Sequence, residues 1–361
     1  MKKSLLILAA TAIVVSCAKT DSLNETNEIP IGFTKVYIEN GTKAIAKGAY
    51  TTANFETVGN TFGVFGYKTT STQTNALLFD DQKVEYKSGL STDLYEATND
   101  WAYSPLKYWD KSATYYYFYA YAPHEGDFTG TAALSSNSAT AFSITGFKQA
   151  TTKSTMIDLM TDLSSKATVS GDAIGTNDVA FTFGHILSNI NVKMAVSDAL
   201  KADNHDNPVT VVSLTLGAIK MDGDYAYNTT ATAYKWTLAT TSPTTQTFPA
   251  TQTSGNVFAS DALTSVTTGY TNVPDMTDLL FVPQTVDAGY KFVIQYKINN
   301  EVFDKEIPLS SFKNTSEQGL ATWEPGNKYT YQIVIGPDPI LFDFTSVSDW
   351  ADGGTYTYTI Q

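Results

Sequence analysis

The chain has 361 residues, a net charge of −13 and no arginine, so that every basic side chain is a lysine. A negative balance of this size repels a phosphate backbone, and no basic stripe interrupts it, which excludes nucleic acid as a partner. Tyrosine (22) and phenylalanine (19) are abundant. Because aromatic and β-branched residues favour strands, the composition predicts an all-β protein.

The first 16 residues have the pattern of an export signal that ends at Cys17. A basic start at 2–3 is followed by an apolar run over 5–15, too short to cross a bilayer, and by small residues before the cysteine. The pattern resembles a bacterial lipoprotein signal, which implies removal of residues 1–16 and acylation of Cys17 with chains such as palmitate. The alternative is an ordinary secretory signal with an incidental cysteine. Since the chain has no second cysteine, Cys17 lacks a disulfide partner, which favours the lipid.

Residues 17–28 are polar and without periodicity, so they predict a flexible tether. From residue 29 onward, short strands alternate with turn signals such as Asn40-Gly41 and Glu125-Gly126. Such regular spacing favours a β-sandwich or a barrel. In the first half of the chain we expect strands at 29–38, 61–67, 103–108, 115–121 and 142–147.

The middle of the chain suggests a division into two all-β domains, 29–178 and 179–361. Apolar residues at helical spacing allow a short amphipathic helix over 154–165, although a buried loop or strand is nearly as well supported. The polar, glycine-containing stretch 164–178 is the best candidate for a linker. Strand patterns then resume at 179–183, 190–196, 209–219, 233–238, 279–283, 290–298 and 328–335.

The C-terminal segment, about 340–361, contains two strand patterns, and the second of them carries no charge. We expect strands at 340–344 and 355–360, separated by a turn-rich spacer over 347–354. In the last strand, Tyr356, Tyr358 and Ile360 alternate with threonines, so they face one side. Such a strand can pair with its own sheet or with the open edge of another molecule.

Several separated motifs together resemble one family, the fimbrillins of Bacteroidales, which are pilus subunits and related surface lipoproteins. Each motif alone is weak, but their order extends over nearly the whole chain. They are Ile31-Gly32-Phe33, Phe62-Gly63-Val64-Phe65-Gly66-Tyr67, Trp101-Ala102-Tyr103-Ser104-Pro105, Tyr117-Phe118-Tyr119-Ala120-Tyr121, Phe183-Gly184-His185, Phe281-Val282-Pro283-Gln284 and Trp323-Glu324-Pro325-Gly326.

The resemblance implies two transthyretin-like β-sandwich domains and a cell-surface, outer-membrane lipoprotein that joins other pilus subunits by donor-strand exchange. In that process a protease removes the first strand, here 31–38, and a neighbour's C-terminal strand fills the groove. A host or bacterial surface receptor is a further implied partner. The implied donor residues are Tyr356, Tyr358, Ile360, Ile340, Phe342 and Phe344.

Two features qualify this resemblance. The best-known members are cut after an arginine, whereas this chain offers only Lys43 and Lys47 in the loop after the first strand. A cut subunit would serve in the stalk or at the tip, and an uncut, lipidated subunit would serve as an anchor. Ser22, in the tether, lies in a sequence that resembles the O-glycosylation site of exported Bacteroidales proteins.

The sequence offers little for an enzyme, a metal or a cofactor. His124, His185 and His205 lie far apart, and no serine or cysteine stands in a catalytic motif. The acidic stretches 222–224 and 203–206 contain oxygen ligands of the kind that calcium binds, but tight turns explain them better. We therefore expect no catalytic residue, no metal site and no cofactor.

The alternative function is a lipid-anchored surface protein that binds glycans through exposed aromatic side chains. The candidates for such a platform are Trp101, Trp109, Trp236 and Tyr121. Most of them lie in strand-like alternation, where half of the side chains face the core, so burial is the competing interpretation.

Overall fold

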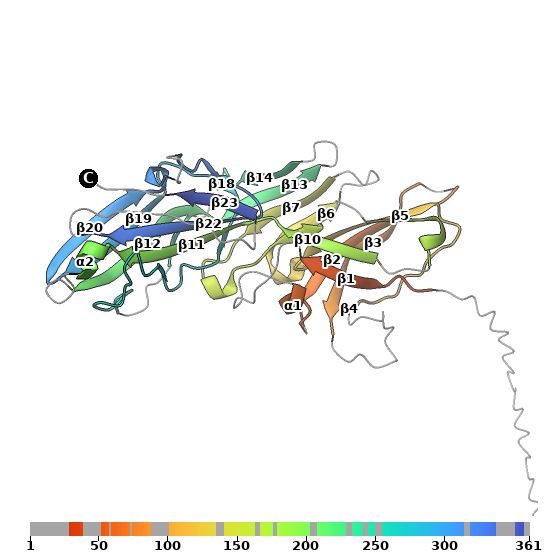
Figure 1. The fold of residues 1–361 in the computed structure, drawn as a ribbon. Helices are drawn as coiled ribbons and strands as arrows, with labels where there is room; N and C mark the ends of the chain where they lie inside the picture. Colours follow the sequence, from red (N-terminus) through yellow and green to blue (C-terminus); the bar gives the residue numbers. More distant parts are fainter. Residues whose placement is uncertain are drawn as a thin grey trace, which may run out of the picture.

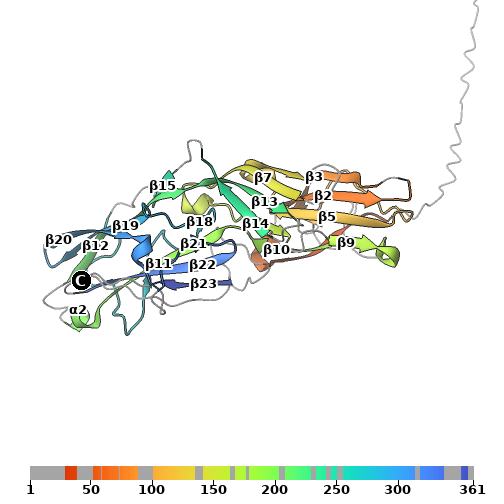
Figure 2. The same cartoon turned by 90° about the horizontal axis from the view of Figure 1, so that it is seen from above.

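The computed structural model describes residues 29–38, 52–57, 59–72, 74–87, 101–134, 141–162, 167–175, 179–202, 208–228, 233–240, 245–249, 255–313, 318–336 and 351–356. In this part of the chain the molecule is elongated, with β2, β3 and β5 at one end and β19, β20 and α2 at the other (Figures 1 and 2). The described α-helices, α1 (Thr52–Phe55) and α2 (Asp198–Ala202), are both short. Among the described residues, no helix is long and apolar enough to span a bilayer.

An eight-stranded sheet forms one end of the molecule. Its strand order is β1-β10-β8-β5-β2-β3-β4, and β9 pairs with β5 outside this path. β1 and β10 run parallel, whereas the other neighbours run antiparallel. The strands are β1 (Phe33–Ile38), β2 (Thr61–Thr69), β3 (Ala76–Tyr86), β4 (Trp101–Ala102), β5 (Tyr115–Ala122), β8 (Met160–Asp162), β9 (Ala167–Ser170) and β10 (Val179–His185).

Four further sheets form the remainder. A five-stranded sheet has the order β16-β11-β22-β23, with β17 on β11, and two four-stranded sheets have the orders β15-β12-β19-β20 and β14-β13-β7-β6; β18 pairs with β21. Their bounds are β6 (Thr129–Leu134), β7 (Ala141–Lys148), β11 (Ser188–Val196), β12 (Val209–Lys220), β13 (Asp222–Asn228), β14 (Ala233–Leu238), β15 (Thr245–Phe248), β16 (Thr271–Asn272), β17 (Leu279–Phe281), β18 (Gln284–Thr285), β19 (Lys291–Ile298), β20 (Glu301–Pro308), β21 (Thr322–Trp323), β22 (Asn327–Ile335) and β23 (Ala351–Tyr356). Short 3-10 turns lie at Glu125–Asp127, Lys153–Thr155, Gly171–Ala173 and Leu309–Ser311.

Two hydrophobic cores result from the alternation of side chains along these strands. The first core lies within the eight-stranded sheet and is rich in phenylalanine, including Phe33, Phe62 and Phe118. The second core joins side chains of β11 and β22 to those of β12 and β19, as in a sandwich. It also includes Phe65 and Tyr121, from the opposite face of the eight-stranded sheet.

Close packing on β2 explains its glycines. The ring of Tyr121 lies so near Gly63 that an added Cβ would stand 2.3 Å from it. Likewise an added Cβ at Gly66 would stand 2.7 Å from the ring of Phe79. Glycine at these positions therefore lets aromatic rings of neighbouring strands lie directly on the backbone of β2.

The all-β, sandwich-like fold that the sequence predicts is confirmed, and most of the predicted strands are present. Residues 103–108 are not a strand, because the strand ends at Ala102 and the following residues pack beside the N-terminal segment. Of the two alternatives for 154–165, the helix is wrong over the described residues 154–162, where a 3-10 turn and an extended segment lead to β8, as the loop or strand alternative expected. The supposed linker 164–178 contains β9, which pairs with β5.

The division into two domains at residue 178 stays a prediction. The sheets themselves do not divide at residue 178, because strands from after it pair with strands from before it. β10 pairs with β1 and β8, and β13 pairs with β7. Residues 222–224, expected as a tight turn, lie at the start of β13. β23 begins at Ala351, inside the stretch expected as a spacer over 347–354.

Candidate assembly site

The N-terminal segment is held by backbone hydrogen bonds on both of its sides. The amide of Val179 donates to the carbonyl of Gly32 at 2.8 Å, next to the β1–β10 pairing. On the other side, the amide of Ile31 donates to the carbonyl of Lys107 at 2.8 Å, and the amide of Trp109 donates to the carbonyl of Ile29 at 2.9 Å. The segment therefore fills a slot between β10 and residues 107–109.

Phe33 anchors this segment in an aromatic socket. Its side chain is fully buried, and five aromatic rings lie with their centroids within 5.4–6.3 Å of its own. Ile31 and Ile38 are buried as well. Burial of side chains of this kind contributes roughly 1.5–3 kcal/mol each. The rings of the socket belong to Phe62, Phe79, Tyr103, Phe118 and Phe181.

Tyr103 adds a side-chain hydrogen bond to this slot. Its hydroxyl donates to the carbonyl of Ile31 at 2.7 Å. Burial raises the pKa of Tyr103 to about 12, and the hydrogen bond with Lys107 only partly opposes this rise. Because the phenol stays protonated at physiological pH, its donor to Ile31 is always present.

The C-terminal strand β23 occupies the edge of the five-stranded sheet. It pairs in parallel with β22, where Asn327 faces Ala351 and Tyr331 faces Tyr356, with a register shift in between. Over its described residues the strand is docked on its own subunit, whereas most of the strand expected at 355–360 lies outside the described part of the chain. A parallel edge pairing is slightly less stable per residue than an antiparallel one.

The two terminal strands share one geometry. β1 lies at an edge of its sheet and runs parallel to β10, and β23 lies at an edge of another sheet and runs parallel to β22. Parallel strands have evenly spaced, slanted hydrogen bonds.

Of the residues that the sequence singled out, Tyr356 lies in β23, which the structure describes by its backbone pairing. The strand 31–38 is present as the segment that ends in β1. Sequence reasoning missed the socket around Phe33, although the aromatic runs near residues 62, 118 and 181 signalled it. The other predicted site residues lie outside the described part of the chain: Cys17, Ser22, Lys43, Lys47, Ile340, Phe342, Phe344, Tyr358 and Ile360.

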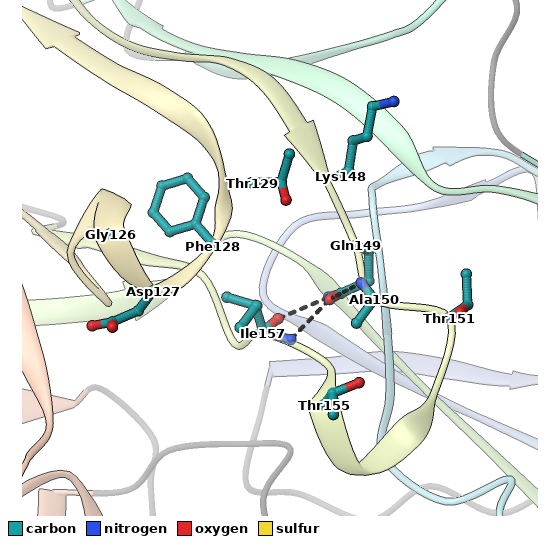
Figure 3. Close-up of a pocket in the computed structure, with 10 residues that line it drawn as sticks. All are labelled: Gly126, Asp127, Phe128, Thr129, Lys148, Gln149, Ala150, Thr151, Thr155 and Ile157. Carbon is teal, nitrogen blue, oxygen red and sulfur yellow. Dashed lines mark hydrogen bonds between the residues drawn. The ribbon is translucent and has the colours of Figure 1, made fainter.

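An open pocket of about 580 Å³ lies between β6, β7 and the segment before β8. Its lining mixes Phe128 and Ile157 with Asp127 and Lys148. The amide of Gln149 is occupied by the backbone of Ile157, donating to its carbonyl and accepting from its amide, both at 2.8 Å (Figure 3). Gln149 therefore holds the segment before β8 against the end of β7.

The two described histidines, His124 and His185, have carboxylate partners within the fold. Nδ1 of His185, at the end of β10, lies 2.9 Å from a carboxylate oxygen of Asp158, and both side chains are buried. His124 lies beside Asp81, with Nε2 3.5 Å from a carboxylate oxygen. Within the described residues, no group of three or more His, Cys, Asp or Glu side chains could hold a metal ion. His205 lies outside them.

The aromatic residues predicted as a glycan platform do not form one. Trp101, Trp109 and Tyr121 are buried, so the competing interpretation, burial in the core, holds for them. Trp236 is half-buried, and its indole nitrogen donates to the carbonyl of Ile186 at 2.6 Å.

Comparison with known proteins gives one consistent result. A family model described as fimbrillin-like matches residues 43–350, well over half of the chain. The fimbrium subunit Fim1C of Phocaeicola vulgatus is 28% identical over an alignment that covers 98% of this chain and 96% of that protein. The crystal structure of a fimbrial protein from Bacteroides vulgatus is similar with a TM-score of 0.57 and 21% identity, and covers 87% of this chain and 98% of its own. At this level of sequence identity, the similarity to the crystal structure supports a shared fold only.

Proposed function

Because the chain belongs to the fimbrillin-like family of cell-surface fimbrial subunits, we propose that it joins neighbouring subunits by exchange of its terminal strands. Such a subunit is structural and not an enzyme, and it serves adhesion as part of the fimbria. The observation that carries the proposal is the N-terminal segment: it fills an aromatic slot, yet it stands at the edge of its sheet. Removal of the segment would leave a groove that another strand can fill.

The groove would be strongly apolar. Without Phe33, the rings of Phe62, Phe118 and Phe181 would lose their common partner, and the edge of β10 would lose its hydrogen bonds. Exposed edges and apolar surface of this kind bind an added strand through main-chain hydrogen bonds and alternate side chains. The groove therefore has a strong tendency to be refilled.

The donor is the C-terminal segment of the next subunit. The place of β23 at the edge of its sheet supports this assignment, because an edge strand can leave its sheet and pair with another open edge. The side chains proposed to enter the groove are apolar residues spaced by two along the segment, as a strand requires. They are Ile340, Phe342, Phe344, Tyr356, Tyr358 and Ile360.

Release of the first strand requires a cut in the loop that follows it. We assign the cut to Lys43 or Lys47, the lysines of that loop, in the absence of any arginine. A cut chain would build the stalk or the tip. An uncut chain, held by an acylated Cys17 and a tether that carries Ser22 as a glycosylation site, would anchor the fimbria to the outer membrane. Both roles require export, and both use two transthyretin-like sandwich domains.

Limited trypsin digestion of the purified full chain tests the exchange, since trypsin cuts after lysine. We expect a cut after Lys43 or Lys47, followed by a ladder of oligomers that resists SDS without heating. The matched control is the variant Lys43→Gln/Lys47→Gln, which should stay monomeric under the same treatment.

Two further variants identify the donor. Tyr356→Asp/Tyr358→Asp should still be cut but should form no ladder, because charged side chains cannot enter an apolar groove. A chain ending at residue 336 should behave in the same way. Ladders from both variants would contradict a C-terminal donor.

The N-terminus of the protein on the cell surface separates the two roles. A start at Ala44 or Gly48, read by mass spectrometry from isolated fimbriae, would identify a cut stalk or tip subunit. An acylated Cys17 in all assembled material would identify an anchor and would contradict the stalk.

A further inference from the structure

A lysine and an asparagine lie side by side near the start of the two middle strands of the five-stranded sheet. β11 and β22 run parallel (Figure 1), and their register places Asn189 of β11 opposite Lys328 of β22. Because the strands are paired at these two residues, both side chains project from the same face of the sheet. Asn191 lies on that face as well, two residues further along β11. These residues are far apart in the chain, so only the fold brings the lysine to the asparagines.

Asp278 contacts both the lysine and the first asparagine through one carboxylate oxygen. Nζ of Lys328 lies 3.1 Å from Oδ1 of Asp278. Nδ2 of Asn189 donates to the same oxygen at 3.2 Å. A single proton acceptor therefore connects the amine of the lysine with the amide nitrogen of the asparagine.

Asn191 acts on the other end of the same amide. Its Nδ2 donates to Oδ1 of Asn189 at 2.7 Å. Its own Oδ1 accepts from the backbone amide of Asp278 at 2.9 Å, which fixes its orientation. The carbonyl of Asn189 is thus polarised by a donor that is held in place. We call Asn189, Asn191, Asp278 and Lys328 the amide cluster.

The amide cluster is shielded from solvent. Asn189 is fully buried, Asn191 and Asp278 are each 5% exposed, and the side chain of Lys328 is 17% exposed. A buried ion pair is by itself weak evidence of stabilisation, because desolvation offsets much of its attraction. The cluster adds to that pair an amide whose nitrogen contacts the acid and whose oxygen has a donor. Amine, amide, acid and oxyanion donor are the groups that transfer of an acyl group to an amine requires.

We propose that Lys328 and Asn189 form an intramolecular isopeptide bond. The ammonium of Lys328 passes a proton to Asp278, and the free Nζ attacks Cγ of Asn189 to form a carbon–nitrogen bond. Asn191 stabilises the negative charge that develops on Oδ1 of Asn189. Asp278 delivers its proton to Nδ2 of Asn189, and the bond between Cγ and Nδ2 breaks.

The atoms of this reaction balance without a co-reactant. Nζ of Lys328 keeps one hydrogen in the new amide, and its other two hydrogens leave with Nδ2 of Asn189 as ammonium. Asp278 ends as the carboxylate that it was at the start, and nothing is oxidised or reduced. Asn189 is the electrophile and Asp278 the relay, because a carboxylate resists attack by an amine whereas the neutral Asn189 carbonyl is polarised by Asn191.

The bond ties β11 to β22 within the second core. The chain has a single cysteine, so no internal disulfide can provide such a tie. A covalent link stabilises a fold more when it closes a longer loop, and this loop extends from residue 189 to residue 328. The proposal is independent of strand exchange, because neither strand is a terminal strand.

Tryptic digestion of the denatured full chain, followed by tandem mass spectrometry, tests the proposal. Because trypsin cuts after lysine, an unlinked chain yields the separate peptides 167–193 and 314–328. We expect peptide 167–193 joined to 314–361, lighter than their sum by one ammonia, since a modified Lys328 is not cut. Separate, unmodified peptides would overturn the proposal. A link that fragmentation assigns to Asn191, or to Asp278 with loss of water, would overturn it as well.

Two variants test the roles of the amine and the acid. Lys328→Arg keeps a cation beside Asp278 but removes the nucleophile, and Asp278→Asn removes the proton relay. Both should release peptide 167–193 without a link, and a link that persists in either would overturn the mechanism. If a variant fails to fold, the digest of the original chain decides the proposal, because it needs no variant.

The matched control is Lys291→Arg, the same change at a surface lysine that pairs with Glu306 at 2.7 Å. This variant should retain the link between peptides 167–193 and 314–361. Lys328→Arg should lower the midpoint of thermal unfolding by roughly 10 °C, because the unfolded chain regains the freedom of a long loop. Lys291→Arg should leave the midpoint unchanged, and equal midpoints for the two variants would contradict a stabilising link.

Discussion

The two terminal strands are both parallel edge strands, but they are held differently. The segment that ends in β1 is bonded on both sides, to β10 and to residues 107–109, and it places Phe33 inside a ring of aromatic side chains. Among the described residues, β23 pairs with β22, and its register is interrupted by a shift. The first strand completes a core, whereas the last strand extends the edge of a sheet.

This difference explains how one chain can supply both the groove and the donor strand of the proposed exchange. A strand that completes a core is costly to remove, so its loss requires a covalent cut. A strand that only extends an edge can leave by local opening, because local openings cost less than global unfolding. The following experiments can contradict or refine this comparison, from the largest expected effect to the smallest.

Phe33→Ala should have the largest effect on stability. The change leaves a cavity within five aromatic rings, and Phe→Ala in a core costs about 3–5 kcal/mol. Urea denaturation of the full chain measures the loss. Val302→Ala, at a side chain that is 49% exposed, should cost less than about 0.5 kcal/mol. A loss below 1 kcal/mol for Phe33→Ala would mean that the first strand does not complete the core.

Hydrogen exchange measured by mass spectrometry compares the two strands directly. Amides of β23 should exchange at least about a hundredfold faster than amides of β1, since the edge strand opens locally while β1 opens with its core. Peptides from β10 and β22, the two neighbours, serve as references. Equal protection of β1 and β23 would contradict the distinction between the strands.

Tyr103→Phe should have a moderate effect that is specific to the first strand. The variant keeps the ring but loses the hydroxyl that donates to Ile31. A buried hydrogen bond of this kind contributes about 1 kcal/mol. Because the pKa of Tyr103 is raised to about 12, the loss in urea denaturation should be constant between pH 6 and pH 9. If the loss of stability varies between pH 6 and pH 9, it does not come from the hydrogen bond of the Tyr103 hydroxyl.

Asp81→Asn should have the smallest effect on the free energy of unfolding. At neutral pH it should raise this free energy, whereas the preceding variants lower it. Burial raises the pKa of Asp81, Glu125 adds to the rise, and Tyr121 and His124 oppose it. Because the folded protein holds this proton more tightly than the unfolded chain, the contribution of Asp81 is complete below its ordinary value of 3.8 and is lost as pH rises through the raised pKa.

The variant should therefore be more stable than the original chain at pH 7, and the difference should shrink as pH falls toward 4. Thermal unfolding at a series of pH values measures it. Glu85→Gln, on the same strand, is the control. If the difference in thermal stability between the variant and the original chain stays constant with pH, the ionisation of Asp81 is not its cause.

The sequence predicted strands well where aromatic alternation is strong and poorly elsewhere. β5 was evident because both of its faces are aromatic or apolar, and β22 was evident because Tyr329, Tyr331 and Ile333 alternate along one face. β3 and β20 were missed, because their outer faces carry charges such as Asp80 and Glu306, which hide a half-buried strand. Residues 103–108 were mistaken for a strand because Tyr103 and Trp109 are aromatic, although they fill space beside β1.

The candidate site was predictable only in part. The first strand was evident from its own residues, but its partner β10 lies far along the chain, and pairing between distant strands leaves no local pattern. β23 starts earlier than expected because Gly353 and Gly354, which are typical of turns, are here part of an edge strand. The socket of Phe33 required knowledge of which faces of β2, β3 and β5 meet.

The close contact between β5 and β2 has a consequence for how related chains vary. Tyr119 and Tyr121 are fixed by the neighbouring sheet, and the ring of Tyr121 additionally requires a glycine at position 63. Among descendants of a common ancestor, a residue larger than glycine at position 63 should therefore appear only where position 121 has lost its aromatic ring.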